Sequence, residues 1–187
     1  MIDVVYDACV LYSASLRDFL LNIARVRLVR PHWSNEIHTE WIRSLLRNRP
    51  DLSRESLERT RRRMDTKFKS SLAKGYEAII PTLTLPDPDD RHILAVAIQT
   101  QSSWIVTHNL DDFPKANLHR HKIEALSPDE FVSRLIKKNP RSILQAAKKH
   151  RTSLTRPPKT ADEYLATLER QKLPKTVAFL REHENEI

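Results

Sequence analysis

The sequence predicts an α/β fold in which a central, mainly parallel sheet lies between two layers of helices, followed by an α-helical C-terminal extension. Short β-branched apolar runs alternate with segments of helical periodicity through the first 137 residues, as is typical of a parallel sheet covered on both faces. Beyond Asn139-Pro140 only helical patterns follow. We therefore expect two units, residues 1–137 and residues 138–187.

Apolar runs and turn residues place the strands. We expect strands at Ile2–Tyr6, at Leu28–Val29 with an end at Pro31, at Trp104–Val106 and at Lys122–Leu126. Prolines 81, 86 and 88 each fix the backbone and lack a donor, so residues 81–88 are expected to be a loop.

Amphipathic spacing and capping residues place the helices. They are expected over residues 14–25, 34–46, 53–68, 90–100, 128–138, 141–151, 161–171 and 175–182. Ser127-Pro128-Asp129-Glu130 has the spacing of a complete capping box with proline at the first helical position, which is the strongest local signal in the chain.

The composition excludes several classes of function. Gly75 is the only glycine, so neither a G-x-G-x-x-G dinucleotide turn nor a Walker A loop can form. The single cysteine, Cys9, excludes an internal disulfide and a zinc site of several cysteines, which favours a reducing compartment. No apolar run is long enough for a membrane span and the N-terminus lacks signal-peptide character. We expect a cytoplasmic protein with no membrane partner.

The net charge of +8 is concentrated in one segment. Between Phe131 and Ala161 there are nine basic residues and no acidic one, whereas the rest of the chain carries a net charge of −1. Such a segment is either a solvated helix face or a surface for a polyanion, because neutralised phosphates release counterions. An acidic partner protein would use the same charge. A second basic cluster, at residues 59–69, would widen this surface.

Acidic and polar residues gather where parallel strands are expected to end. Asp7 follows the first strand directly, and the polar residues after the Trp104 strand are Thr107, Asn109, Asp111 and Asp112. The loop before the alanine-rich helix contains Asp87, Asp89 and Asp90, and a separate helix carries Glu40. Because the C-terminal ends of parallel strands meet at one edge of the sheet, four elements direct carboxylates toward one site.

Clustered carboxylates repel one another, and a divalent cation removes that cost. Mg²⁺ or Mn²⁺ takes oxygen ligands, and a pair of such ions activates water against a phosphodiester. Structural alternatives remain open at this point: Asp89 and Asp90 are also natural helix caps, and Asn109 and Asp112 are common turn residues. Glu40 could pair with Arg43. The histidines near these positions are expected at the surface or in turns rather than as ligands, namely His92, His108 and His119.

Three segments resemble conserved motifs of the PIN-domain nucleases. They are DACVL from Asp7, DRHILAVA from Asp90, and IVTHNLDDF from Ile105. They occur in the family's order, at spacings suited to a domain of about 130 residues. The resemblance covers residues 1–137 and is closest in arrangement to VapC-like toxins of bacterial toxin–antitoxin pairs. Residues 138–187 are similar to an extension in a longer-chain subgroup.

The resemblance implies a PIN-like three-layer fold and a Mg²⁺- or Mn²⁺-dependent endoribonuclease, commonly dimeric and inhibited by a small DNA-binding antitoxin. Transferred by position, it assigns catalysis and metal binding to Asp7, Glu40, Asp90 and Asp112. Glu36 competes with Glu40, and Cys9 replaces the asparagine of many relatives. Supporting roles fall to Thr107, Asn109, Asp111 and Asp89, and RNA contacts are expected from Lys148, Lys149 and Arg151. The alternatives are an inert RNA- or protein-binding module and a nuclease acting on DNA.

Overall fold

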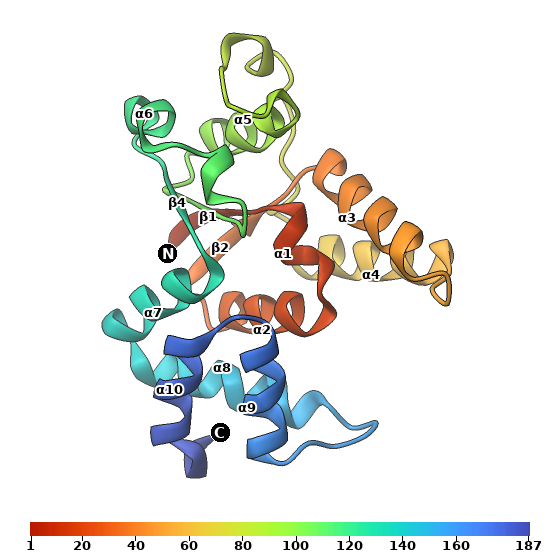
Figure 1. Ribbon diagram of the computed structural model, residues 1–187, viewed down its shortest axis with the longest axis vertical. Coiled ribbons are helices and arrows are strands. Elements are labelled where there is room, and N and C mark those ends of the chain that lie inside the picture. Colours follow the sequence, from red (N-terminus) through yellow and green to blue (C-terminus); the bar gives the residue numbers. More distant parts are fainter.

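A four-stranded, fully parallel sheet forms the centre of the molecule in the computed structural model, which describes residues 1–187 (Figure 1). The strand order is β2-β1-β3-β4, with β1 (Ile2–Tyr6) and β3 (Trp104–Val106) inside and β2 (Val29–His32) and β4 (Glu124–Leu126) at the edges. The predicted α/β fold with a parallel sheet is therefore confirmed.

The inner strand β3 and the last three residues of β1 are buried, because almost all their side chains are apolar on both faces of the sheet. Val5 pairs with Ile105 on one side and with His32 on the other, and Val5 and Ile105 are fully buried. The prediction that Pro31 ends the second strand is wrong, since Pro31 pairs with Val4 inside β2. An edge strand tolerates this proline because one side of its backbone has no partner strand.

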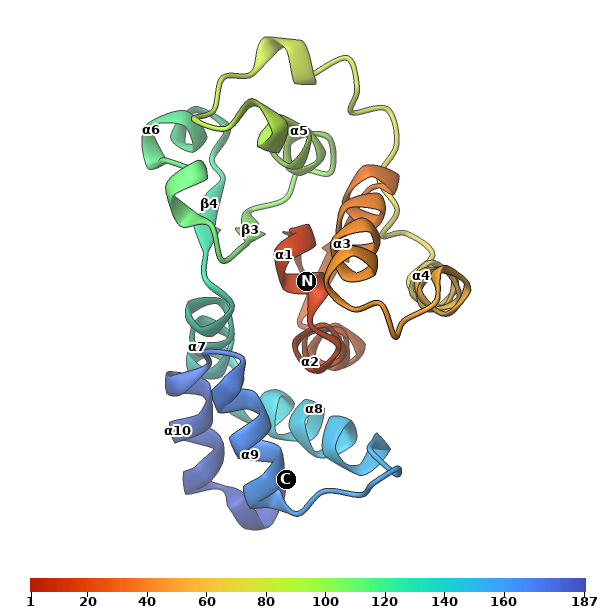
Figure 2. The same cartoon turned by 45° about the vertical axis from the view of Figure 1, so that its right-hand side comes forward.

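Helices cover both faces of the sheet (Figures 1 and 2). On one side lie α5 (Arg91–Gln99) and α6 (Lys115–Leu118), and on the other lie α2 (Ala14–Arg25) and α7 (Pro128–Lys138). Next to the β1–β2 side are α1 (Ala8–Tyr12), α3 (Asn35–Asn48) and α4 (Arg54–Lys67). Short 3-10 turns lie at Ile80–Thr82, Pro88–Asp90, Leu110–Asp112, His119–His121 and Glu184–Glu186. No helix combines the length and the apolar character that crossing a bilayer requires.

The predicted capping box at the start of α7 is only half formed. The Ser127 hydroxyl accepts a hydrogen bond from Glu130 N at 3.2 Å, as expected. The Glu130 carboxylate instead accepts from Arg134 Nε at 3.1 Å and Lys175 Nζ at 2.8 Å, because two cations compete for it. A complete capping box that was not among the predictions occurs between Thr160 and Glu163 at the start of α9 (Ala161–Arg170).

The C-terminal helices pack as a further layer beneath α2 and α7. Helix α8 (Pro140–Ser153) lies along α2, and α10 (Pro174–Glu182) lies against α7 (Figure 1). Buried Ile143 and Leu165 belong to the same hydrophobic cluster as the strands. Residues 138–187 therefore share one core with residues 1–137, and the division at residue 138 stays a prediction about folding units.

A carboxylate on α7 fixes the position of α10. Asp129 is 7% exposed and accepts hydrogen bonds from Lys175 N at 3.0 Å, Thr176 N at 2.9 Å and Thr176 Oγ1 at 2.9 Å. The two backbone N–H groups lie in the first turn of α10, where no carbonyl of the same helix is available to accept a hydrogen bond from them. Asp129 thus serves as the N-terminal cap of a helix 46 residues further along the chain.

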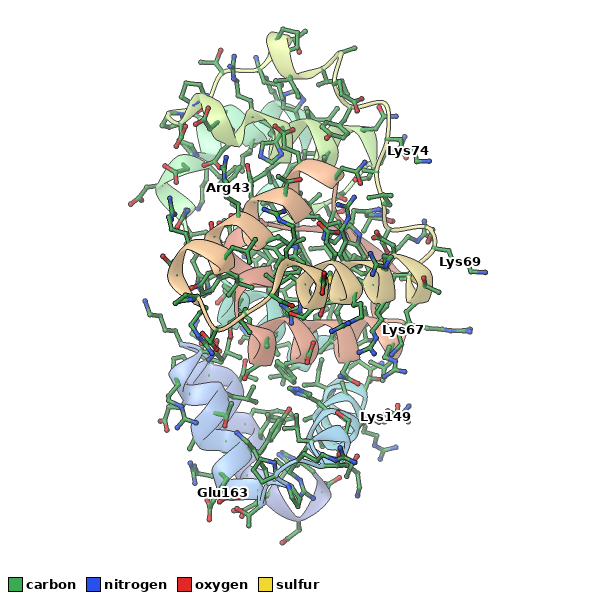
Figure 3. All side chains as sticks on the ribbon, turned by 90° about the vertical axis from the view of Figure 1, so that its right-hand side faces the viewer. Arg43, Lys67, Lys69, Lys74, Lys149 and Glu163 are labelled. Carbon is green, nitrogen blue, oxygen red and sulfur yellow. The ribbon has the colours of Figure 1, made fainter.

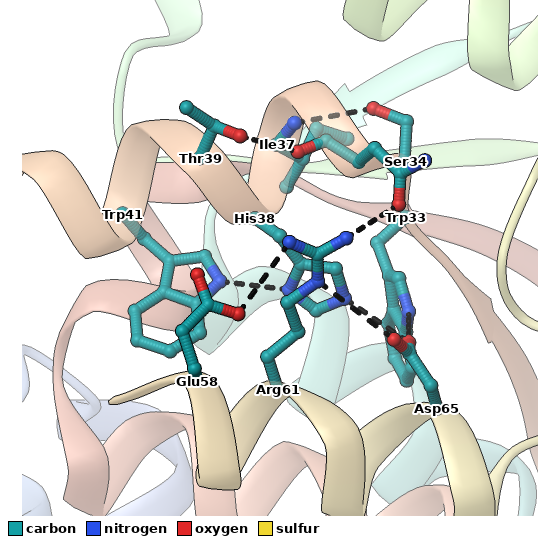
Figure 4. Close-up of polar contacts among 10 residues, drawn as sticks. Trp33, Ser34, Ile37, His38, Thr39, Trp41, Glu58, Arg61 and Asp65 are labelled. Carbon is teal, nitrogen blue, oxygen red and sulfur yellow. Dashed lines mark hydrogen bonds and ion pairs between the residues drawn. The ribbon is translucent and has the colours of Figure 1, made fainter. Parts of the chain in front are cut away.

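A buried hydrogen-bond network attaches α4 to α3 (Figure 4). Trp41 Nε1 donates to His38 Nδ1 at 3.0 Å, and Trp33 Nε1 donates to Asp65 Oδ1 at 2.8 Å. His38 Nε2 lies 3.1 Å from the same Asp65 oxygen. Because its Nδ1 accepts, the neutral His38 ring carries its proton on Nε2 and donates to Asp65.

We predict that His38 makes the stability of the protein sensitive to mild acid. Burial lowers the pKa of His38 despite the charge of Asp65, so the folded protein keeps the ring neutral below pH 6.5 while the unfolded chain takes up a proton. His38→Gln should cost about 1–2 kcal/mol at pH 7.5 through lost hydrogen bonds. In urea unfolding, this difference from the wild type should shrink between pH 7.5 and pH 5.5. A difference that is constant with pH would contradict the assignment, and exposed His119→Gln is the control.

Candidate functional site

The C-terminal ends of β1 and β3 meet at the centre of the sheet. Asp7 N donates to Val106 O at 3.1 Å, which extends the pairing of the two strands by one residue. At this point the Thr107 hydroxyl donates to Asp7 Oδ2 at 2.6 Å. Asp7 is 4% exposed and Thr107 is fully buried, so the threonine fixes the orientation of a largely buried carboxylate.

The thiol of Cys9 is a second donor to Asp7. Its Sγ lies 3.0 Å from Asp7 Oδ2 and 3.4 Å from Thr107 Oγ1, and it accepts from His108 N at 3.2 Å. Burial and the charge of Asp7 raise the pKa of Cys9 to about 12, so the thiol remains protonated at neutral pH. The cysteine thus supplies a hydrogen bond that helps to hold the Asp7 carboxylate.

Several carboxylates surround Asp90, which lies half-buried at the start of α5. Burial raises the pKa of Asp90 to about 7, together with the negative charges of Asp7, Asp112, Asp87 and Glu40. These groups act on Asp90 only because they lie close to it. The charges of three other residues expected from the sequence, Asp7, Glu40 and Asp112, and that of Asp87 thus act on Asp90, and the role of these residues in one catalytic site stays a prediction.

His92 lies inside this site, which corrects the expectation that it is a surface or turn residue. It is 3% exposed on α5, and its Nε2 lies 2.9 Å from Glu40 Oε1, while its Nδ1 lies 3.6 Å from Glu36 Oε2. Burial works to lower the pKa of His92, but the hydrogen bond and charge of Glu40 with the charges of Glu36 and Asp7 outweigh it and raise the pKa. His92 therefore orients Glu40 and offsets part of its charge.

Glu40 is favoured over its competitor Glu36. Glu40 makes the shorter contact with His92, and it is Glu40 whose charge acts on Asp90. The sequence held one indirect signal for His92: α5 is apolar on nearly all sides, so a histidine in its first turn requires a polar partner from another element. Only the packing of α3 against α5 identifies that partner.

The other expected supporting residues lie at the rim of the site. Asn109 contributes its backbone N–H, which donates to Thr107 Oγ1 at 2.9 Å, while its side chain is exposed. Asp89 and Asp111 are exposed in 3-10 turns, and Asp89 N donates to Asp87 Oδ1 at 2.8 Å. Their supporting roles stay predictions.

The three basic residues expected to contact RNA have different surroundings. Lys148 and Lys149 are exposed on α8. Arg151 donates to Lys159 O at 3.0 Å and to Ile187 O at 2.9 Å, so it holds the loop after α8 and the C-terminal residue in place. Its guanidinium is thus engaged within the extension, and the expected RNA contact of Arg151 stays a prediction.

Another part of the extension lies near the carboxylates. Burial lowers the pKa of His108, and the positive charge of Lys172 lowers it further, while Asp7 opposes the shift. Lys172 belongs to the turn between α9 and α10. This turn is therefore near enough to the end of β3 for its charge to act on His108, a proximity that no sequence motif indicates.

The donor set suits a hard divalent cation. All the candidate ligands are carboxylate oxygens, which Mg²⁺ and Mn²⁺ prefer. No three acidic, histidine or cysteine side chains converge closely enough to hold an ion by themselves. Mg²⁺ keeps several waters and needs only one or two direct carboxylates, so the residues present fit a hydrated ion. Bound there, it would remove the repulsion that raises the pKa of Asp90.

Comparison with known proteins identifies the family. The PIN domain family model matches residues 3–111, and the model of the VapC50 C-terminal domain matches residues 128–182. The chain therefore belongs to the PIN domain family, as its motifs predicted. The second match begins in α7, ten residues before the expected division.

One curated relative shares part of this sequence. It is "Putative ribonuclease VapC50" of Mycobacterium tuberculosis (strain ATCC 25618 / H37Rv), which is 38% identical over 63 residues. The matched region is 34% of this chain and 37% of the relative, so the match spans little more than a third of that protein's length. No solved structure matches the chain.

We predict that Asp90→Asn stabilises the protein in metal-free buffer. At pH 8 the carboxylate is ionised in a half-buried site among like charges, so its neutral isostere should raise the free energy of unfolding by about 1 kcal/mol. Urea unfolding in the presence of a chelator measures the change. Exposed Asp111→Asn is the matched control and should have little effect. A destabilised Asp90→Asn variant would show that burial and repulsion of the Asp90 charge do not dominate at this position.

Proposed function

We propose that this protein is a divalent-metal-dependent endoribonuclease, and that it acts as the toxin of a toxin–antitoxin pair. The observation that carries the proposal is the set of carboxylates whose charges act on Asp90 at the C-terminal edge of a PIN-domain sheet. A site of this composition needs no side chain as the nucleophile, because a water molecule activated by a metal ion can take that role. It therefore suits hydrolysis by water.

In this proposal Asp7, Glu40, Asp90 and Asp112 hold Mg²⁺ or Mn²⁺. Such an ion supplies charge stabilisation and lowers the pKa of an attacking water. Thr107 and Cys9 hold Asp7 in one orientation through their hydrogen bonds to Oδ2. His92 does the same for Glu40. Fixed carboxylates need no reorganisation when RNA binds, which is the contribution of this chain to the reaction.

The assignment to a toxin rests on similarity. The relative in M. tuberculosis is named a putative ribonuclease VapC50, and the model of the VapC50 C-terminal domain matches residues 128–182. From this similarity we infer that the protein acts on RNA in the cytoplasm, forms a homodimer and has a small DNA-binding antitoxin as its partner. Exposed Lys148 and Lys149 remain proposed RNA contacts.

We predict that RNA cleavage requires Asp7. With single-stranded RNA and Mn²⁺ or Mg²⁺, Asp7→Asn should reduce the cleavage rate at least about 100-fold, because a charged ligand is lost while the fold is kept. Rates are measured by gel electrophoresis of labelled RNA. Mn²⁺ should also raise the melting temperature of the wild type but not of Asp7→Asn.

The controls separate the site from general effects of charge. Exposed Asp111→Asn should retain most of the activity, and a chelator should abolish wild-type cleavage. Cleavage that persists in the chelator would exclude the metal mechanism. RNA binding without any turnover would instead favour the inert binding module.

The proposed toxicity is tested separately in growing cells. Induced expression of the wild type should arrest growth, whereas Asp7→Asn expressed to the same level should not. Equal arrest by both proteins would show that toxicity does not depend on the carboxylate site.

A further inference from the structure

A basic groove lies between α2 and α4, outside the carboxylate site. Its volume is about 320 Å³, and it reaches Ser153 at the end of α8. Its charged lining residues are Arg17, Asp18, Arg25, Arg63 and Lys67, of which only Asp18 is acidic. We call this feature the α2–α4 groove. It joins the nuclease fold to the C-terminal extension.

Two neighbouring hollows share residues with this groove and are also basic. Lys67 lines all three, so the hollows adjoin one another along the second half of α4. The two hollows add Arg59 and Arg62 on α4, with Arg30 and Lys69 beyond it. Figure 3 shows that Lys67, Lys69 and Lys149 lie on the face of the molecule turned to the viewer there.

Most of these cations are not neutralised by the protein. Arg30 lies 3.5 Å from Asp3, but no ion pair forms at Arg25, Arg59, Arg62, Arg63, Lys67 or Lys69. Cations this close together repel one another, and an anionic ligand would relieve that repulsion.

The packing of α4 decides which of its arginines face the groove. Arg61 alone turns toward α3, where it donates to Asn35 Oδ1 at 2.7 Å and lies within 4 Å of Glu58 and Asp65 (Figure 4). Together with the His38 network, this contact fixes the rotation of the helix. Arg59, Arg62 and Arg63 are consequently exposed; Arg63 lines the α2–α4 groove, and all three line the hollow next to it.

The floor of the groove contains polar side chains that the protein does not fully satisfy. Arg17 is 6% exposed and donates from Nη1 to Leu11 O at 2.9 Å, while its Nε makes no hydrogen bond but lies 3.7 Å from Asp18 Oδ1, which offsets part of its charge. Asn22 is 7% exposed; its Nδ2 donates to Asp18 O, and its Oδ1 has no partner. A buried guanidinium beneath the groove adds to the positive potential there.

An aromatic side chain lies at the edge of the same surface. Half-buried Phe68 lines the groove and one of the neighbouring hollows, and its ring is held edge-on by Trp33 at a centroid distance of 6.0 Å. Sites that bind single-stranded nucleic acids typically combine two features: cations along the phosphate backbone, and an aromatic ring on which a base stacks.

We propose that the α2–α4 groove binds the phosphate backbone of a single-stranded RNA segment, apart from the carboxylate site. The groove is rich in arginine, whose planar fork matches phosphate oxygens. Cations spaced three and four residues apart on α4 lie about 5–6 Å from one another, which presents them as a row. Phe68 favours RNA over an acidic protein segment, because it offers a base a stacking surface. The proposal rests on the proposed function in taking RNA as the ligand.

The test measures the binding of a labelled oligouridylate to the full chain in the presence of a chelator. Binding is monitored by fluorescence anisotropy over a series of salt concentrations. The variant Arg59→Gln/Arg63→Gln/Lys67→Gln should weaken binding at least about tenfold at low salt. It should also lower the slope of log affinity against log salt by about 2, since each lost phosphate contact contributes about 0.7. Phe68→Leu should weaken binding without changing the slope.

A matched variant removes the same charge elsewhere. Lys115→Gln/Arg120→Gln/Lys137→Gln replaces three exposed cations that line none of the three hollows, and it should bind RNA as the wild type does. Equal losses in both triple variants, or no loss in the groove variant, would overturn the proposal. Competition by poly-glutamate as strong as that by unlabelled RNA would assign the groove to an acidic protein segment. Because binding is measured without metal, a failure of RNA cleavage is a separate result.

Discussion

The parallel pairing of β1 with β3 at the centre of the sheet is the constraint on which the candidate site depends. It brings Asp7 and Thr107, one hundred positions apart, within 2.6 Å of each other. Asp90 lies at the same edge because it directly precedes α5, which runs back over one face of the sheet to the start of β3. Without this pairing, the motifs near the two ends of the PIN domain would have no common site.

The site accumulates negative charge and limits the cost with neighbouring donors. Thr107, Cys9 and His92 each hold a carboxylate by a hydrogen bond, and His92 also offsets charge. The remaining cost falls on Asp90, whose pKa is raised to about 7 by burial and by the neighbouring negative charges. Positive charge is collected elsewhere, along α2 and α4, so the two kinds of charge do not cancel. This separation is what an enzyme acting on a polyanion requires, because one surface binds phosphate and the other performs chemistry.

The C-terminal extension is part of the same core rather than a detached tail. Asp129 caps α10 from within α7, and Arg151 fixes the last residue of the chain. The excess basic charge in the sequence is consequently divided. Some of it is structural, as in Arg151 and Arg61, and some remains exposed, as in Lys148 and Lys149.

The sequence by itself determined the fold class, the inner strands and nearly all the helices, and it predicted Asp7, Glu40 and Asp112, whose charges act on Asp90. These follow from local periodicity and from motifs, which neighbouring residues encode. Only the tertiary structure decided that His92 contacts Glu40, that Glu130 leaves its capping box for Arg134 and Lys175, and which arginines of α4 are free. Each of these depends on a partner from a distant element, because a polar side chain in a folded protein takes whichever partner the packing brings within hydrogen-bond distance.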